Sequence, residues 1–319
     1  MPPDLRIRVG SRTSPMAVAQ AAHVRDLLLK FSENLDVELI GIETSGDRWQ
    51  GELAELGGKG AFLKEIDRQL VMGAIDVAVH CIKDVPGDVP MPEGTAFAAY
   101  LPREDVHDVV LFPAGSPYRS LDELPAGAHV GTSAVRRKAQ ILRRRPDLQV
   151  DRIRGNVNSR ILRFDSEHGS EHGFDAMVLA LAGLRRIGME DRAVEVLPLD
   201  VMCPPVGAGV IGIQCRTADE GIVELLRLLD DQETRTYVTA ERAMLHDLRG
   251  HCNSPIAGHC TTTADGRLSL LGMVFSGEGG EFAHVQEWDT LDHAQRLGAN
   301  VAAALARKGA HRLIAGTAR

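Results

Sequence analysis

Short apolar runs alternate with helical periodicity over the first hundred residues. Strands are predicted at 5–11 (LRIRVGS), 37–44 (VELIGIET) and 75–82 (IDVAVHCI), and helices over 14–31 and 59–72. Ser14 suits an N-cap and Pro15 the first helical position after it. Because strands that alternate with helices form sheets covered by those helices, we predict a parallel α/β layer here.

The same alternation returns in the next hundred residues. Strands are predicted at 108–112, 128–133, 148–155 and 174–183, with helices beginning near Ala134 and Asn156. Proline and glycine punctuate the chain at 91–95, 101–108 and 202–215, which indicates two crossings between lobes with a cleft between them. We therefore predict one α/β lobe from 1–104 together with 206–228, and a second from 105–205.

The C-terminal part has a different pattern. A long helix is predicted over 231–249, then a loop rich in glycine and cysteine, strands at 267–276 and 282–290, and an alanine-rich amphipathic helix ending near Arg307. This order predicts a small α+β domain over 229–319.

Composition narrows the class of protein. The chain has 319 residues, of which 44% are hydrophobic and 25% charged, as in folded proteins of two or three domains. It has no apolar run long enough to span a membrane and no apolar signal core at its start, so we expect a cytoplasmic protein without membrane contact. A net charge of −8 argues against nucleic-acid binding, and five cysteines without a C-x-x-C motif indicate free thiols.

Arginine accounts for 30 of the 36 cationic residues and is concentrated between 131 and 163. The segments GTSAVRR (131–137) and RGNVNSR (154–160) each follow a predicted strand and open a helix. Backbone N–H groups, hydroxyls and guanidinium groups therefore converge at these points, which predicts a site for a polyanionic ligand. Arg143, Arg144 and Arg145 are interpreted instead as a solvated helix face.

The first lobe repeats this arrangement more weakly. Arg12 in GSRTSP and Lys59 in GGKG lie where strands meet helices, but GGKG lacks the spacing of a nucleotide P-loop. Lys83 and Asp84 follow the strand before Pro86. They could form a simple turn, or Asp84 could stabilise a cationic intermediate or move a proton to nitrogen.

Two His-Cys pairs stand in RGHCNSPIAGHC. Their intervals match no standard zinc spacing, so we expect no metal. Cys252 lies in a predicted glycine-flanked loop, where an exposed thiol could attack an electrophile. The other four cysteines are interpreted as buried and inert, and they are Cys81, Cys203, Cys215 and Cys260.

Eleven segments, in order along nearly the whole chain, resemble the hydroxymethylbilane synthase family, also called porphobilinogen deaminase. These segments are VGSRTSPMAVAQA, TSGD, GGKGAFLKEI, DVAVHCIKDVP, GTSAVRRKAQIL, RRPDL, IRGNVNSRI, DAMVLALAGLRRIG, GVIGIQCR, TAERAMLHDLRG and HCNSPIAG.

The resemblance implies an α/β fold with two periplasmic-binding-protein-like lobes and a small C-terminal α+β domain. It implies a dipyrromethane cofactor held by a thioether to Cys252. The implied reaction condenses four porphobilinogen molecules head to tail, releases ammonia and yields hydroxymethylbilane. The partners would be porphobilinogen and the growing oligopyrrole, bound by a monomer. Each pyrrole carries two carboxylates, which would explain the arginines.

Carried over by position, the resemblance makes Asp84 the catalytic carboxylate that stabilises the azafulvene cation. The other implied cofactor-binding residues are Ser14, Lys83, Thr132, Ser133, Arg136 and Arg137, and the implied substrate-binding residues are Arg12, Lys59, Arg154, Arg160 and Arg186.

Four positions depart from the family's usual residues. They are Ser45, Glu55, Cys81 and Ala208, which stand where Arg or Lys, Lys, Ser and Gln are usual. Two alternatives therefore stay open. One is a divergent paralogue with altered chain length or substrate tolerance, and the other is a two-lobe module that binds a polycarboxylate without catalysis.

Overall fold

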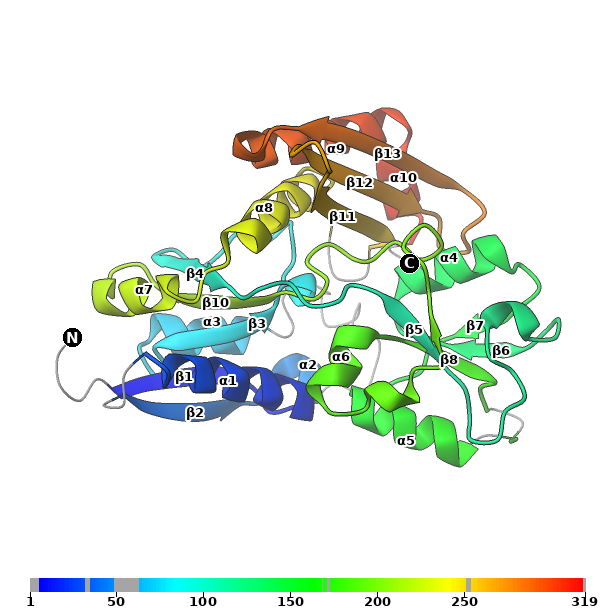
Figure 1. Cartoon of the computed structure of the whole chain (residues 1–319), viewed down its shortest axis with the longest axis horizontal. Helices are drawn as coiled ribbons and strands as arrows, with labels where there is room; N and C mark the ends of the chain where they lie inside the picture. Colours follow the sequence, from blue (N-terminus) through cyan, green and yellow to red (C-terminus); the bar gives the residue numbers. More distant parts are fainter. Residues whose placement is uncertain are drawn as a thin grey trace.

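A computed structural model describes residues 6–31, 35–48, 63–167, 169–170, 173–250 and 254–317. Three separate sheets organise this part of the chain (Figure 1). Two belong to α/β lobes that lie side by side, and the third belongs to a smaller C-terminal domain above them. The predicted fold class is confirmed, whereas the predicted domain boundaries stay a prediction.

The first lobe is built on a five-stranded mixed sheet in the order β2-β1-β3-β10-β4. Its strands are β1 (Arg6–Arg12), β2 (Asp36–Ile42), β3 (Val77–Cys81), β4 (Thr95–Tyr100) and β10 (Ile211–Arg216). The strands β1, β2 and β3 are parallel, as predicted, but β10 runs antiparallel between β3 and β4. The parallel layer predicted for the first hundred residues is therefore confirmed, and β10, a strand from much later in the chain, adds the antiparallel member of the sheet.

In the described part of this lobe, the helical segments are α1 (Pro15–Leu28), α2 (Ser45–Arg48), α3 (Lys64–Val71), α7 (Glu220–Arg227) and the 3₁₀ turn η1 (Ile82–Asp84). The hydroxyl of Ser14 accepts a hydrogen bond from the backbone N–H of Ala17 at 3.4 Å, which confirms the predicted N-cap. Buried aliphatic side chains of β1, β3, β10 and α1 form the core between helix and sheet.

The second lobe contains a sheet in the order β7-β6-β8-β5-β9. Its strands are β5 (Asp108–Leu111), β6 (His129–Gly131), β7 (Gln149–Asp151), β8 (Ala176–Ala180) and β9 (Glu195–Val196). Its helices are α4 (Val135–Arg144), α5 (Val157–Glu167) and α6 (Leu181–Arg186). Two 3₁₀ turns, η2 (Leu121–Glu123) and η3 (Glu190–Arg192), complete the described part of this lobe. The strand predicted over 174–183 ends at Ala180, because α6 begins at the next residue.

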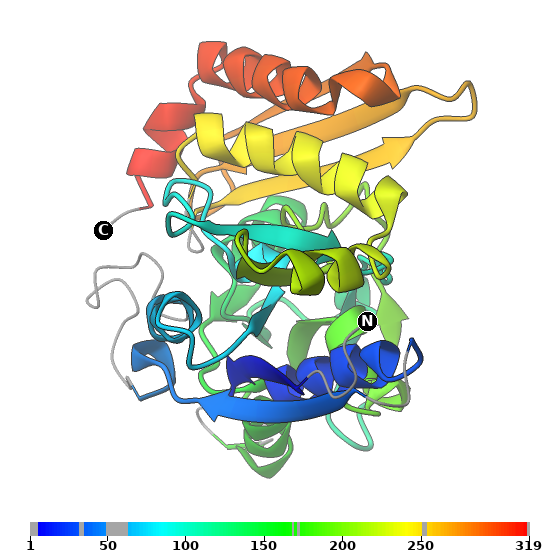
Figure 2. The ribbon, with the colours of Figure 1, turned by 90° about the vertical axis from the view of Figure 1, so that its left-hand side faces the viewer.

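The C-terminal domain has an antiparallel sheet of β11 (Ile256–Thr262), β12 (Leu268–Phe275) and β13 (Phe282–Asp289). Three helices, α8 (Gln232–Asp247), α9 (Ala294–Arg307) and α10 (Ala310–Ala315), and the turn η4 (Leu291–His293) complete it. Figure 2 shows α8 and α9 lying along the sheet. The strand β11 occupies much of the predicted loop, and Cys260 on it is buried in the domain core. No helix among the described residues is long and apolar enough to cross a membrane.

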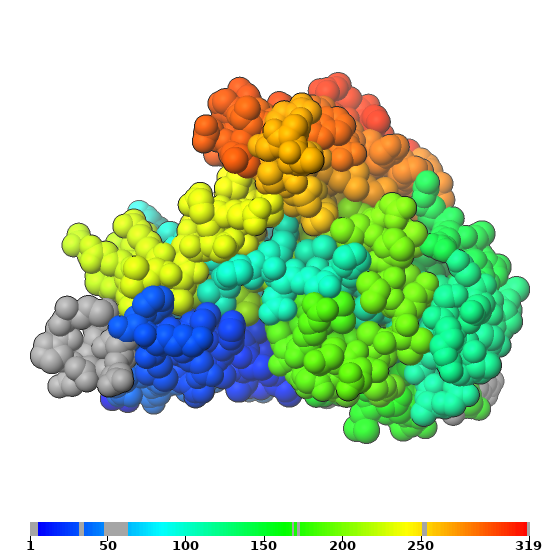
Figure 3. Space-filling model, in the orientation of Figure 1, coloured from blue at the N-terminus to red at the C-terminus, as the bar shows by residue number. Residues whose placement is uncertain are grey.

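The C-terminal domain packs on both lobes, and it forms one continuous surface with them on the face in Figure 3. On the first lobe, Arg242 and His246 of α8 donate hydrogen bonds to backbone carbonyls of 85–87. On the second lobe, the Arg143 guanidinium lies 3.4 Å from the centre of the Phe282 ring. Arg143 is nevertheless exposed, as the solvated interpretation expects. Arg145 departs from that interpretation, because it is half-buried and its guanidinium binds the carbonyls of Leu121 and Leu124.

A buried carboxylate ties the crossings between the lobes to the C-terminal domain. Glu241 of α8 has no solvent exposure and accepts three hydrogen bonds. The donors are Arg103 Nη2 at 2.7 Å, the N–H of Gly207 at 2.8 Å and the N–H of Cys260 at 2.8 Å. Arg103 also donates to the carbonyl of Ala208 at 3.0 Å. One ion pair thus joins both crossings to β11.

Candidate active site

The catalytic candidate Asp84 lies at the carboxyl end of β3, in the turn η1. Ile82, two residues before Asp84, is buried, and its N–H donates to the carbonyl of Val210 at 3.0 Å. Gly207 adopts a positive φ of 72°, and a Cβ there would overlap Ile82. Close packing of this crossing thus fixes the backbone of the turn, with Lys83 and Asp84 half-buried.

Two loops of the second lobe follow the carboxyl ends of β6 and β7, at the edge of the sheet where the anion site is predicted. Thr132 and Ser133 follow β6, and Arg154 follows β7. The Ser133 hydroxyl donates to the carbonyl of Ile153, which joins the two loops, and Thr132 Oγ1 accepts from the N–H of Ala134 at 3.4 Å. These hydroxyls therefore brace the loops in this structure, while Arg154 is exposed.

Arg160 lies among other charged side chains of the candidate site. Its pKa is lowered from the usual value to about 10, first by burial and then by repulsion from Arg137 and Arg152, while Asp84 opposes the shift. Its Nε has no hydrogen-bond partner among the described residues. Arg160, Arg137, Arg152 and Asp84 are thus close enough to interact. A guanidinium held among like charges is a binding group for an anion.

Arg136 and Arg137 share one buried carboxylate. Asp108, at the start of β5, accepts from Arg136 Nη2 at 2.6 Å and from Arg137 Nη2 at 2.7 Å. Burial alone would raise the pKa of Asp108, but the two guanidinium groups hold it well below its usual range. Arg136 also donates to the carbonyl of Cys203. Two cations on one anion leave one positive charge in surplus, and the Nε of Arg137 has no partner in the described part.

Arg12 and Arg186 are held differently. Arg12 donates Nε and Nη2 to Asp47. Burial would raise the pKa of Asp47, but the hydrogen bonds from Arg12 and Thr44, together with the charge of Arg12, lower it. Arg186, at the end of α6, donates Nη2 to the carbonyl of Gly209 at 2.9 Å and Nη1 to the thiol of Cys81 at 3.8 Å. The structure thus gives Arg12 a carboxylate partner and Arg186 only neutral ones among these contacts.

The cysteines divide by burial. Burial raises the pKa of Cys203 to about 12 and of Cys215 to about 11, and it raises the pKa of Cys260 further. These three thiols are buried, as predicted. Cys81 is half-buried and accepts two hydrogen bonds, so its interpretation as a buried residue is wrong. Cys252 and Lys59 lie outside the described residues.

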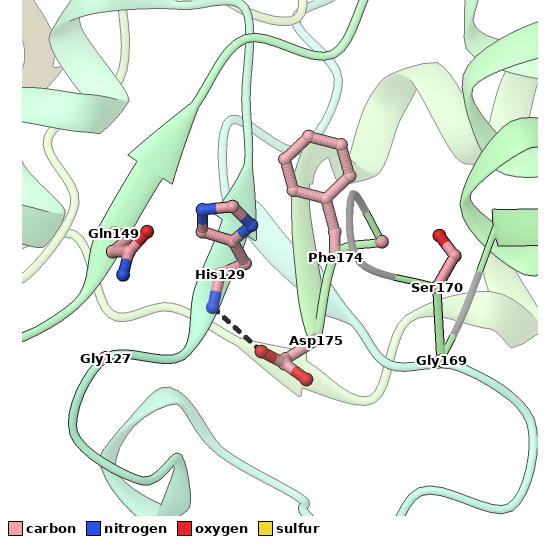
Figure 4. A pocket seen from close by; sticks show the side chains of 8 residues that line it. Gly127, His129, Gln149, Gly169, Ser170, Phe174 and Asp175 are labelled. Carbon is pink, nitrogen blue, oxygen red and sulfur yellow. Dashed lines mark hydrogen bonds between the residues drawn. The ribbon is translucent and has the colours of Figure 1, made fainter.

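A separate hollow of 370 Å³ lies at the opposite edge of the second sheet (Figure 4). His129, Gln149 and Asp175 line it at or just before the amino ends of their strands, and the His129 N–H donates to Asp175 Oδ2 at 2.8 Å. The predicted anion-binding loops follow the carboxyl ends of β6 and β7. The hollow is therefore not part of the candidate site.

Sequence reasoning missed Asp108 and Asp47, the carboxylates that neutralise predicted ligand-binding arginines. The signal for Asp108 was an acid opening an apolar strand, which is costly unless it is paired. No comparable signal marks Asp47. An anionic group fits the site, because three of its arginines keep a buried Nε without a partner in the described residues, and they are Arg137, Arg160 and Arg186.

Two protein-family models match the chain. "Porphobilinogen deaminase, dipyromethane cofactor binding domain" covers residues 7–224, and "Porphobilinogen deaminase, C-terminal domain" covers residues 236–307. Porphobilinogen deaminase 2 of Streptomyces coelicolor is 45% identical over 99% of this chain and 98% of that protein. Porphobilinogen deaminase of Syntrophotalea carbinolica is 40% identical over 97% and 95%.

Among solved structures, the chain is similar to the periplasmic VFT2 domain of Bordetella pertussis BvgS, with a TM-score of 0.39 and 16% identity over 70% of this chain and 86% of that chain.

The family models together cover most of the described elements of all three sheets. With relatives of 40% identity or more along nearly its whole length, this chain belongs to the porphobilinogen deaminase family.

Proposed function

We propose that this protein condenses four porphobilinogen molecules head to tail into hydroxymethylbilane and releases one ammonia at each condensation. The observation that carries the proposal is Arg160, a half-buried guanidinium whose Nε has no partner in the described chain and whose charge interacts with Asp84. Family membership supplies the reaction class, and the arginines supply the fit to its substrate. Each pyrrole unit carries an acetate and a propionate, so the growing chain gains two carboxylates per step.

The arginines bind and orient these carboxylates. Arg137, Arg160 and Arg186 each keep a buried Nε donor without a partner in the described residues. A guanidinium donates in a planar fork that matches a carboxylate, and the pairing is strengthened where water is excluded. Arg154, Lys83 and Lys59 are proposed to add further positive charge. Arg12 and Arg136 would also contribute positive charge, but each is already paired with a carboxylate, Asp47 and Asp108 respectively.

Asp84 is proposed as the catalytic residue. Loss of ammonia leaves positive charge on the pyrrole, and a carboxylate fixed at the end of β3 stabilises that charge. The charge of Asp84 interacts with that of Arg160, so the carboxylate lies beside a guanidinium proposed to bind the substrate. Its rigid turn keeps the oxygens in place during each condensation.

Cys252 is proposed to hold the dipyrromethane cofactor through a thioether. The bound dipyrromethane supplies the pyrrole to which the first substrate unit is joined. Ser14, Thr132 and Ser133 are proposed to contribute hydrogen bonds to it from the ends of β1 and β6. Arg136 and Arg137 would face its carboxylates, with Arg137 the better placed because its Nε has no partner among the described residues.

We further propose a cytoplasmic monomer whose partners are porphobilinogen and the oligopyrrole, with neither nucleic acid nor membrane. The acidic net charge of −8 supports the absence of nucleic acid. Light scattering after size-exclusion chromatography checks the oligomeric state, and cell fractionation checks the location.

The decisive experiment measures the mass of denatured protein from a host that makes porphobilinogen. An excess of two linked pyrrole units, mapped to the peptide with Cys252 and absent in Cys252→Ala, is expected. In addition, Asp84→Asn is expected to load the cofactor and bind substrate but to lower kcat about 10²- to 10³-fold. Arg160→Leu is expected to impair loading or elongation more than folding. An unmodified, inactive wild-type protein would favour the ligand-binding alternative.

A further inference from the structure

We propose that Cys81 is a positioning residue, whose thiol holds the Arg186 guanidinium between the two lobes without neutralising its charge. This inference rests on the proposed function, in which Arg186 binds a substrate carboxylate. It assigns a role to a side chain that lies three residues before Asp84 but outside the chemistry proposed above.

The two residues come from different lobes and meet where α1 approaches α6. Cys81 ends β3 of the first lobe, and Arg186 ends α6 of the second. A Cβ on Gly183 of α6 would lie 3.4 Å from Met16 Cε of α1, which is ordinary packing distance. The helices are therefore in close contact at this point, and the thiol of one lobe reaches the guanidinium of the other.

Hydrogen bonds hold both partners in place. The Cys81 sulfur accepts from Arg186 Nη1 at 3.8 Å and from Gln20 Nε2 at 3.7 Å. Gln20 is buried on α1, so it orients the thiol from within the first lobe. On its other side, Arg186 donates Nη2 to the carbonyl of Gly209 at 2.9 Å. Two fixed acceptors define the plane of the guanidinium.

The chemical nature of these acceptors matters for binding. The acceptors of Arg186 are a cysteine sulfur and a backbone carbonyl, whereas Arg12 and Arg136 are held by carboxylates. Arg186 forms no ion pair with any carboxylate in the described residues. Its Nε is buried and has no partner there. The contact with Cys81 therefore orients the cation while its full charge stays available to an anionic ligand.

The test compares Cys81→Asp with Cys81→Asn, which has nearly the same shape without the charge. A carboxylate at this position would pair with Arg186 and compete with substrate. Cys81→Asp is therefore expected to raise the KM for porphobilinogen about 10- to 100-fold above that of Cys81→Asn, with kcat within about threefold. Val18→Asp adds the same charge on the exposed side of α1 and is expected to leave KM unchanged.

A second pair of variants covers the possibility that Cys81→Asp fails to fold, as judged by circular dichroism. Cys81→Ala removes the acceptor and is expected to raise KM several-fold, whereas Cys81→Ser keeps an acceptor and is expected to restore it. Equal KM values for Cys81→Asp and Cys81→Asn, or for Cys81→Ala and Cys81→Ser, would overturn the inference while leaving the proposed function intact.

An inactive wild-type protein would overturn the proposed function instead. Calorimetric titration with porphobilinogen then decides the positioning role separately. Weaker binding to Cys81→Asp than to Cys81→Asn supports it, and equal binding or no binding to either variant refutes it.

Discussion

Asp108→Asn is the perturbation for which the structure gives the clearest expected magnitude. The Asp108 carboxylate is 1% exposed and binds Arg136 and Arg137 at 2.6 and 2.7 Å. Both guanidinium groups are themselves buried. The substitution keeps the size of the side chain but leaves two buried positive charges without their only carboxylate partner in the described residues. Because these groups are buried, solvent does not replace the lost interaction. The loss in free energy of unfolding should therefore lie at the upper end of the values measured for ion pairs.

Removal of one partner from a buried ion pair lowers the free energy of unfolding by about 3–5 kcal/mol. We expect a loss in this range for Asp108→Asn, measured by urea denaturation at pH 7 with circular dichroism. The matched control is Asp122→Asn, which removes the carboxylate from the exposed pair with Arg144. Its loss is expected to stay below about 1 kcal/mol.

The pH dependence provides a second readout. Because the folded pKa of Asp108 is lowered, its contribution is present above pH 4 and is lost as the pH falls below that value. The variant should therefore show a shallower loss of stability in acid than the wild type. A loss as small as that of Asp122→Asn, with an unchanged acid profile, would refute the assignment of Asp108 as the anion that stabilises both arginines.

Three further predictions concern other parts of the fold. Glu241→Gln should lower the free energy of unfolding by about 3–5 kcal/mol, because the buried carboxylate accepts three hydrogen bonds, and the exposed Glu224→Gln is the control with an expected change near zero. Burial lowers the pKa of His80 to about 4, so its neutral form stabilises the protein above pH 6.5 and this stability is lost as the pH falls toward 4. The wild type should therefore lose about 3 kcal/mol of free energy of unfolding between pH 6.5 and pH 4 that His80→Gln does not lose. Identical pH profiles of stability for the two proteins would contradict this prediction. Gly279→Ala should lower thermal stability, because φ is 74° and a Cβ would overlap the carbonyl of Ala139 in α4, whereas Gly280→Ala, with open space around it, should have a small effect.

Local pattern was enough to predict many elements of the fold. Alternation and capping placed β1, α1 and β3 within a few residues, and the hydroxyl of Ser14 caps α1 as expected. These features depend on neighbours along the chain, since periodicity and the N-cap involve only nearby residues. The order of motifs was likewise sufficient to predict the family, which the matching family models confirm.

The pairing of distant strands was decided by tertiary structure. The strand β10 enters the first sheet antiparallel, and β11 forms within a stretch that reads locally as a loop. Short apolar segments carry no local mark of direction, because their hydrogen bonds are made with strands far away in the sequence. The same holds for Cys260, whose burial follows from the register of β11 with β12.

For the candidate site, the sequence determined which residues carry charge, and the tertiary structure decided which charges are compensated. Arg12, Arg136 and Arg160 look equivalent in their motifs, yet Asp47 binds the first, Asp108 binds the second, and the Nε of the third has no partner in the described chain. The partners lie 35 and 28 residues away from Arg12 and Arg136. Electrostatic compensation acts through space and depends on burial, so no local pattern distinguishes an arginine that stabilises the fold from one available to a ligand.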